Sequence, residues 1–277
     1  MSQDAPVAGR VAEYDEGVFT KGRYCRHPAW IRRAIAYHER VNPFTERLER
    51  VQERIAAACH RAGRAPEEVQ LMGVSKMHPA EVLREASQAG LTLFGENRVQ
   101  EFEEKRGRLE ELGVRDVGVH LIGHLQSNKS ARAAEIFDGV DSVDSLRLAD
   151  RLNDAAGKLG KTLPVLLEVK LSDEPTKAGL DPEGSELEGL LERLPDLRNL
   201  AMRGLMTIAP LDDDPETARV CFRRLRTLRD EVARRHARLS FAVLSMGMSG
   251  DFEGAIEEGS TLVRIGTALF GERVARR

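Results

Sequence analysis

The sequence predicts an α/β fold: a closed (β/α)8 barrel, the TIM barrel, formed by a single domain with an extra N-terminal helix. Apolar segments of strand length alternate with helical patterns, and about eight such pairs fill most of the chain, which is the repeat number of this barrel. The segments are mostly apolar and do not alternate strictly with polar residues, as expected for parallel strands buried on both faces. No GxGxxG motif follows the first of them, which disfavours the alternative fold, an open doubly wound sheet.

Each element follows from its own pattern of apolar residues. The extra helix begins at Thr45, places Leu48, Val51 and Ile55 on one face, and stops near Gly63. The predicted strands are residues 69–75, 91–95, 117–123, 140–143, 163–171, 201–208, 239–245 and 262–266. The predicted helices between them are residues 80–89, 98–112, 129–136, 146–159, 186–194, 215–235 and 252–258.

Residues 1–43 differ from the rest, because they mix basic side chains with Tyr24, Trp30 and Tyr37 and keep no helical or strand period. We therefore expect a poorly ordered N-terminal extension, followed by the barrel in residues 44–277. Contact with RNA or with a partner protein is the alternative role for such a basic segment.

The bulk properties exclude several classes of protein. A net charge of −3 and a pI near 6.2 argue against nucleic-acid binding. No apolar stretch approaches the roughly 18 residues that a membrane span needs. Cys25, Cys59 and Cys221 lack CxxC spacing, so we predict no disulfide framework and a cytoplasmic setting.

Lys76 ends the first predicted strand, and barrels of this kind carry their chemistry at the carboxyl ends of the strands. Burial disfavours the ammonium form of a lysine, and the neutral amine can attack an aldehyde to form a Schiff base. Far along the chain, Arg264 adds a fixed positive charge. Gly266 lets the backbone come close to a ligand, and Thr267 adds a hydroxyl. Together these features predict a pocket for pyridoxal 5′-phosphate (PLP). The alternative is a strand-end lysine that reaches solvent.

The phosphate site is predicted in the loops after the seventh and eighth strands, where such barrels often hold this group. The first loop is residues 245–249, in which Ser249 is expected to cap the helix that begins near Asp251. Gly247 and Gly266 give backbone N–H groups access to an anion.

Arg264 lies inside an apolar run, where an unpaired guanidinium would be costly. Directed inward, it can donate to the pyridine nitrogen of PLP, leave that nitrogen unprotonated and make the ring a weak electron sink. His120 and His124 share a face if they lie on one strand, which raises the alternative of a metal site. A third ligand is missing nearby, so we predict no metal.

Several motifs together resemble the PLP homeostasis proteins, which share the barrel of the alanine racemase N-terminal domain. The resemblance runs from about Thr45 to Gly271. Its motifs are Gly73-Val74-Ser75-Lys76, Phe94-Gly95-Glu96-Asn97, His120-Leu121-Ile122-Gly123-His124-Leu125-Gln126-Ser127-Asn128-Lys129, Arg203-Gly204-Leu205-Met206-Thr207-Ile208, Leu244-Ser245-Met246-Gly247-Met248-Ser249 and Val263-Arg264-Ile265-Gly266-Thr267.

The resemblance implies a role for each matching residue. Lys76 would hold PLP as a Schiff base, Asn97 would line the pocket, and Arg264 would face the pyridine nitrogen. The phosphate would be held by Ser245, Met246, Ser249, Gly266 and Thr267.

The resemblance also implies the function: a monomeric protein without catalytic residues that binds PLP for intracellular PLP homeostasis, with apo-enzymes as partners. The alternative is a PLP-dependent racemase or decarboxylase of fold type III. Against it, all three tyrosines lie within residues 1–43, and the second domain that supplies the catalytic tyrosine of alanine racemases is missing. The family often has a second lysine two positions after the first, where this chain has His78.

Overall fold

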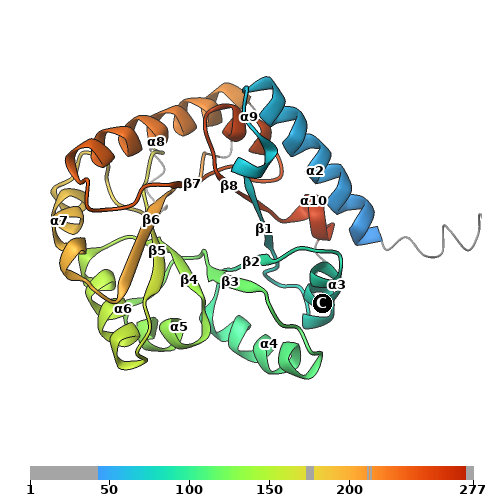
Figure 1. Ribbon diagram of the computed structural model, residues 1–277, viewed down its shortest axis with the longest axis horizontal. Helices are drawn as coiled ribbons and strands as arrows, with labels where there is room; N and C mark the ends of the chain where they lie inside the picture. Colours follow the sequence, from blue (N-terminus) through green and yellow to red (C-terminus); the bar gives the residue numbers. More distant parts are fainter. Residues whose placement is uncertain (1–42, 173–177, 211, 213, 273–277) are drawn as a thin grey trace, which may run out of the picture. The chain divides into compact units, whose positions relative to one another are not determined.

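The computed structural model describes residues 43–172, 178–210, 212 and 214–272. The predicted N-terminal extension, apart from its last residue, Pro43, lies outside these residues, so that prediction stays untested. The described residues form a barrel of strands surrounded by helices (Figure 1).

Eight parallel strands close the barrel in the order β1 to β8, with β8 pairing back to β1. They are β1 (Gln70–Val74), β2 (Leu93–Glu96), β3 (Gly118–Leu121), β4 (Gly139–Val143), β5 (Leu163–Glu168), β6 (Leu200–Met206), β7 (Val243–Ser245) and β8 (Leu262–Ile265). Every predicted strand is present, and the TIM barrel is confirmed. Because the strands are parallel, their carboxyl ends all open at one end of the barrel.

The helices lie outside the sheet (Figure 1). They are α2 (Pro43–Arg61), α3 (Ala80–Gln88), α4 (Val99–Glu111), α5 (Ser130–Ile136), α6 (Leu146–Lys158), α7 (Ser185–Arg193), α8 (Pro215–Arg235), α9 (Phe252–Glu257) and α10 (Thr267–Phe270). Besides shifts of one to three residues at the ends of other elements, two details differ from the prediction. The strand β7 is shorter than residues 239–245, because the Leu239 N–H donates to the His236 carbonyl and continues the turn after α8. The four-residue helix α10 was not predicted.

The alternation of side chains along the strands decides which residues reach the mouth of the barrel. Apolar side chains fill the interior as one cluster, formed by Met72, Val74, Leu93, Ile122, Leu166, Met206 and Leu262. Successive residues of a strand point to opposite faces, so a residue two positions further on faces inward again. By this spacing Lys76 follows Val74, Glu168 follows Leu166, and Arg264 follows Leu262. The barrel therefore directs charged groups from three strands into its mouth.

Gly204 permits β6 and β7 to pair closely. A Cβ atom at this position would lie 1.8 Å from the carbonyl oxygen of Val243, and φ is +159°. No other residue fits without separating these strands.

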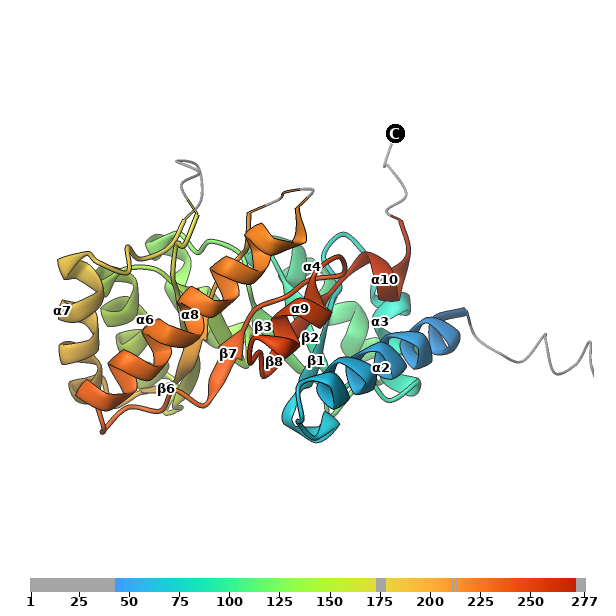
Figure 2. The same cartoon turned by 90° about the horizontal axis from the view of Figure 1, so that it is seen from above.

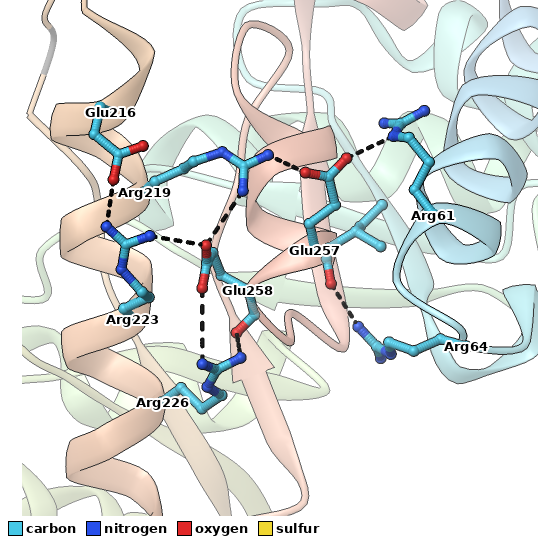
Figure 3. Close-up of polar contacts among 9 residues, drawn as sticks. Arg61, Arg64, Glu216, Arg219, Arg223, Arg226, Glu257 and Glu258 are labelled. Atoms are coloured by element: carbon cyan, nitrogen blue, oxygen red, sulfur yellow. Dashed lines mark hydrogen bonds and ion pairs between the residues drawn. The ribbon is translucent and has the colours of Figure 1, made fainter.

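Ion pairs hold α9 between α2 and α8 (Figure 3). Glu257 contacts Arg61 of α2 at 2.7 Å and also contacts Arg219 of α8. Next to it, Glu258 contacts Arg219 and Arg223 of α8, each at 3.2 Å. A single exposed ion pair contributes roughly 0.2–1 kcal/mol, so we expect this network mainly to fix the orientation of α9.

The helix α2 also supports the short helices α9 and α10, beside which it lies in Figure 2. Arg64, in the turn just after α2, donates to the carbonyl oxygens of Ile256 and Ser260 at 2.9 and 2.7 Å. Arg47 donates to the carbonyl oxygen of Leu269, in α10. The extra N-terminal helix thus buttresses the two helices that follow β7 and β8.

Within the described ranges, no helix is long and apolar enough to cross a membrane.

Candidate functional site

A cavity of about 550 Å³ lies at the carboxyl ends of the strands. Its walls come from the ends of seven of the eight strands or from the residues just after them. The lining residues are Val74, Lys76, Asn97, Ile122, Gly123, His124, Glu168, Val169, Lys170, Ser172, Ala178, Ile208, Met248 and Arg264. Three residues predicted from the sequence, Lys76, Asn97 and Arg264, thus come together around one cavity.

Lys76 is half-buried and lies beside apolar wall residues such as Val74 and Ile122. Asn97, just after β2, reaches the same cavity. Its backbone packs against Gly123, where an added Cβ would lie 2.3 Å from the Asn97 carbonyl oxygen. The glycine therefore lets the loops after β2 and β3 close together at the cavity wall.

Arg264 is buried and is held by two hydrogen bonds. One of its N–H groups donates to the Ser245 hydroxyl at 2.6 Å, and another donates to the Thr207 carbonyl at 2.7 Å. The carboxylates of Asp141 and Glu168 lie close enough to favour its positive charge. The guanidinium therefore has a defined orientation at the cavity wall.

The loops predicted to hold phosphate meet at the start of α10. The Ser249 hydroxyl accepts a hydrogen bond from the Ala268 N–H at 3.3 Å, which joins the loop after β7 to the residues after β8. Gly266 and Thr267 begin that turn, and Thr267 is exposed. An added Cβ at Gly266 would lie in ordinary van der Waals contact with Val74, at 3.7 Å, so a small side chain would fit at this position without a clash.

The prediction that Ser249 caps α9 is wrong. The N-cap of α9 is Asp251, and Ser249 turns away from that helix toward α10. The Asp251 carboxylate accepts a hydrogen bond from the Met248 N–H and closes the loop on itself.

Ser245 and Met246, the first two residues of the 245–249 segment, are fully buried. The Ser245 hydroxyl is occupied by Arg264. The Met246 side chain packs in the core, and its N–H donates to the Leu262 carbonyl at 3.1 Å.

His120 and His124 do not share a strand face, because β3 ends at Leu121. Each histidine instead contacts one aspartate: His120 lies 3.0 Å from Asp141, and His124 lies 2.8 Å from Asp144. Among the described residues, no three His, Cys, Asp or Glu side chains form a group that could hold a metal.

Glu168, the last residue of β5, lines the cavity but was missed in the sequence. The signal was its spacing of two from Leu166, an inward-facing residue. Burial, together with the nearby Asp144 carboxylate, raises the pKa of Glu168 to about 7, against the opposing effects of Arg264 and His124. This carboxyl therefore changes its charge near neutral pH.

Glu168→Gln is expected to reduce the loss of stability on going from pH 5 to pH 8. The pKa of Glu168 is about 7 in the folded protein against an ordinary value of 4.5, so the folded state binds more protons in that window. Stability contributed by this group is thus present below pH 4.5 and falls as the pH rises through 7. Glutamine does not titrate, and the decline should shrink by on the order of 1–3 kcal/mol.

The measurement is the free energy of unfolding in urea at both pH values, without ligand. Glu104→Gln, an exposed change on α4, serves as the control and should keep the original decline. Equal declines in the native protein and in Glu168→Gln would contradict the prediction.

A closed barrel with an amine and a buried arginine around one cavity at its carboxyl end defines the class of the alanine racemase N-terminal domain. The family model described as "Alanine racemase, N-terminal domain" matches residues 47–274. The alanine racemase of Clostridium difficile 630 is 17% identical, with a TM-score of 0.61 over 80% of this chain and 56% of that chain, which is a likeness of fold alone.

More similar relatives narrow this class. The pyridoxal phosphate homeostasis protein of Aquifex aeolicus is 48% identical over 82% of this chain and 97% of its own length. That of Escherichia coli K12 is 43% identical over 84% of this chain and 98% of its own length. PipY of Synechococcus elongatus PCC7942, solved with PLP bound, is 44% identical, with a TM-score of 0.70 over 80% of this chain and 100% of that chain. The chain belongs to the family of pyridoxal phosphate homeostasis proteins, and the resemblance found in its sequence is confirmed.

Proposed function

We propose that this protein binds PLP through the amine of Lys76 and serves intracellular PLP homeostasis without substantial turnover of amino acids. The observation that carries the proposal is the meeting of Lys76, Asn97 and Arg264 around one cavity. A relative that is 44% identical has been solved with PLP bound, which supports the same cofactor here.

The residues present fit this cofactor. The cavity volume lies within the usual range of about 300–1,000 Å³ for small-molecule sites. Gly266 has no side chain to cover its backbone, so an anionic group can approach it near the Ser249 and Thr267 hydroxyls. Bound PLP would supply an aldehyde, and the Lys76 amine would hold it as a Schiff base, with loss of water.

We assign the remaining residues from their contacts. Arg264 faces the pyridine nitrogen, and Ser245 acts by holding the Arg264 guanidinium in place. Ser249, Gly266 and Thr267 hold the phosphate. Met246 supports these loops from the core. This replaces the direct phosphate contact that the resemblance implied for Ser245 and Met246.

The proposal extends to the cellular role. The protein acts as a monomer in the cytoplasm and passes PLP to apo-enzymes. The relatives named pyridoxal phosphate homeostasis proteins support this role.

Turnover is disfavoured by two features of the chain. An arginine keeps its proton, so Arg264 would leave the pyridine nitrogen unprotonated and weaken the stabilisation of a carbanion. The three tyrosines are Tyr14, Tyr24 and Tyr37, so the barrel sequence has none to act as a second base. A positioned base is worth roughly 10²- to 10⁴-fold in rate.

The native protein loaded with PLP is expected to exchange the Cα hydrogen of alanine no faster than Lys76→Ala treated in the same way. The measurement is proton NMR in D₂O over hours with L-alanine and D-alanine, and an alanine racemase serves as the positive control. Exchange at ordinary enzymatic rates that is lost in Lys76→Ala would make the protein an enzyme and reject the carrier proposal.

A further inference from the structure

The two peptide groups on either side of Lys76 are held by side chains of one helix, α4. In the peptide before Lys76, the Ser75 carbonyl accepts a hydrogen bond from Lys105 Nζ at 3.1 Å. In the peptide after Lys76, the Met77 N–H donates to the Glu101 carboxylate. Lys105 and Glu101 are four residues apart on α4, and their charged atoms lie 3.5 Å from each other. The backbone of Lys76 is therefore fixed from both sides.

A buried carboxylate anchors Lys105. Glu96, at the end of β2, is fully buried, and its Oε1 atom lies 2.6 Å from Lys105 Nζ. The same oxygen accepts a hydrogen bond from the Ser75 hydroxyl at 2.7 Å. Lys105 is only 8% exposed, so each charge would be costly without the other. We call Ser75, Glu96, Glu101 and Lys105 the α4 network.

The backbone at Met77 needs such support. Its φ is +65°, in the left-handed region that methionine rarely adopts, and the residue is 59% exposed. Packing of that side chain therefore does little to stabilise this conformation. The hydrogen bond to Glu101 stabilises it instead, and with it the turn that follows Lys76.

We propose that Glu96, Glu101 and Lys105 are positioning residues for Lys76, and that the α4 network aims its side chain into the cavity before PLP arrives. The inference rests on the proposed function. The network lies on the side of the chain opposite the cavity: Ser75 contacts Glu96 of β2 and Lys105 of α4, whereas Lys76 lines the cavity. Fixing both peptide groups sets the direction of the Lys76 Cα–Cβ bond, so the backbone conformations at this residue need not be lost on reaction.

The test compares capture of PLP with binding of a ligand that cannot react. The captured form is followed by its visible absorbance after rapid mixing, and the modified lysine is identified by borohydride reduction and peptide mapping. The non-reacting probe is 4′-deoxypyridoxine 5′-phosphate, which lacks the aldehyde. In Glu101→Ala we expect the rate of capture to fall roughly ten- to hundred-fold, because the amine is displaced from its attacking position. Affinity for the probe should stay within about twofold, because its contacts are not changed.

Three further variants separate positioning from general damage. Glu104→Ala makes the same change at an exposed position of α4 and should capture PLP at the native rate. Glu101→Gln keeps an acceptor oxygen for the Met77 N–H and should recover most of the rate. Lys105→Met leaves Glu96 as an unpaired buried charge, so it is paired with Glu96→Gln in a double variant that should fold and still capture PLP slowly.

The inference would be overturned if both Glu101→Ala and the double variant captured PLP at the native rate. It would also be overturned if the rate of PLP capture and the affinity for the probe fell by the same factor. The proposed function fails separately: it fails if the native protein itself carries no PLP on Lys76 after reduction.

Discussion

Lys76→Ala is expected to abolish the visible absorbance of the PLP-loaded protein and the fraction of PLP fixed by borohydride. The Lys76 amine is the group that can bond to the aldehyde at the end of β1, and alanine removes it without changing the backbone of the turn. The remaining contacts, to Arg264 and to the phosphate loops, should still bind PLP weakly and without a covalent bond. The loss of fixed PLP should therefore be complete, while the loss of total binding should be partial.

Lys170 provides a matched control, because it is the other lysine known to line the cavity in the part of the chain that the structure describes. Lys170→Ala should keep both the absorbance and the fixed PLP. Peptide mapping of the native protein after borohydride reduction identifies the lysine that carries PLP. If the modified lysine is Lys170, or any lysine other than Lys76, the assignment is wrong.

The barrel was predictable because each of its strands has a local signature. The predominantly apolar runs that became β1 and β8 are typical of strands buried on both faces, and the number of such runs favoured the closed barrel. The site at the strand ends followed from the same pattern, since Lys76 and Arg264 stand at the ends of such runs. Short elements carried less signal: α10 is four residues long, too short to show a helical period.

The parts that were missed depend on contacts between distant segments. Lys105 looked like an ordinary charged residue of α4, and only the fold brings it to Glu96 and to the Ser75 carbonyl. The direction of Ser249 likewise depends on where α10 begins, 18 residues later. Glu168 was predictable in principle, because the alternation that places Leu166 in the barrel interior also applies two residues further on.

Gly266→Val is expected to weaken PLP roughly ten- to hundred-fold and to leave the affinity for pyridoxal almost unchanged. An added Cβ would meet nothing closer than Val74, at 3.7 Å, so the barrel itself can accept a side chain at this position. The new methyl groups would occupy the space through which the backbone reaches the phosphate. A hydrogen bond to a charged group contributes about 1.5–3 kcal/mol, and each 1.4 kcal/mol is a factor of ten in affinity. Pyridoxal has no phosphate and does not depend on these bonds.

The comparison with pyridoxal is what distinguishes a phosphate site from general damage to the barrel. Affinities for both ligands are measured by titration of the visible absorbance, together with the thermal midpoint of the unloaded protein. Gly189→Val, in the α7 helix, is the control, because a Cβ there meets no atom within 4 Å. It should change neither affinity. If Gly266→Val weakens PLP and pyridoxal by the same factor, the phosphate does not bind at this backbone. Phosphate recognition would then have to be assigned to other residues around the cavity, and the Lys170 ammonium, which also lines it, would be a candidate by its charge.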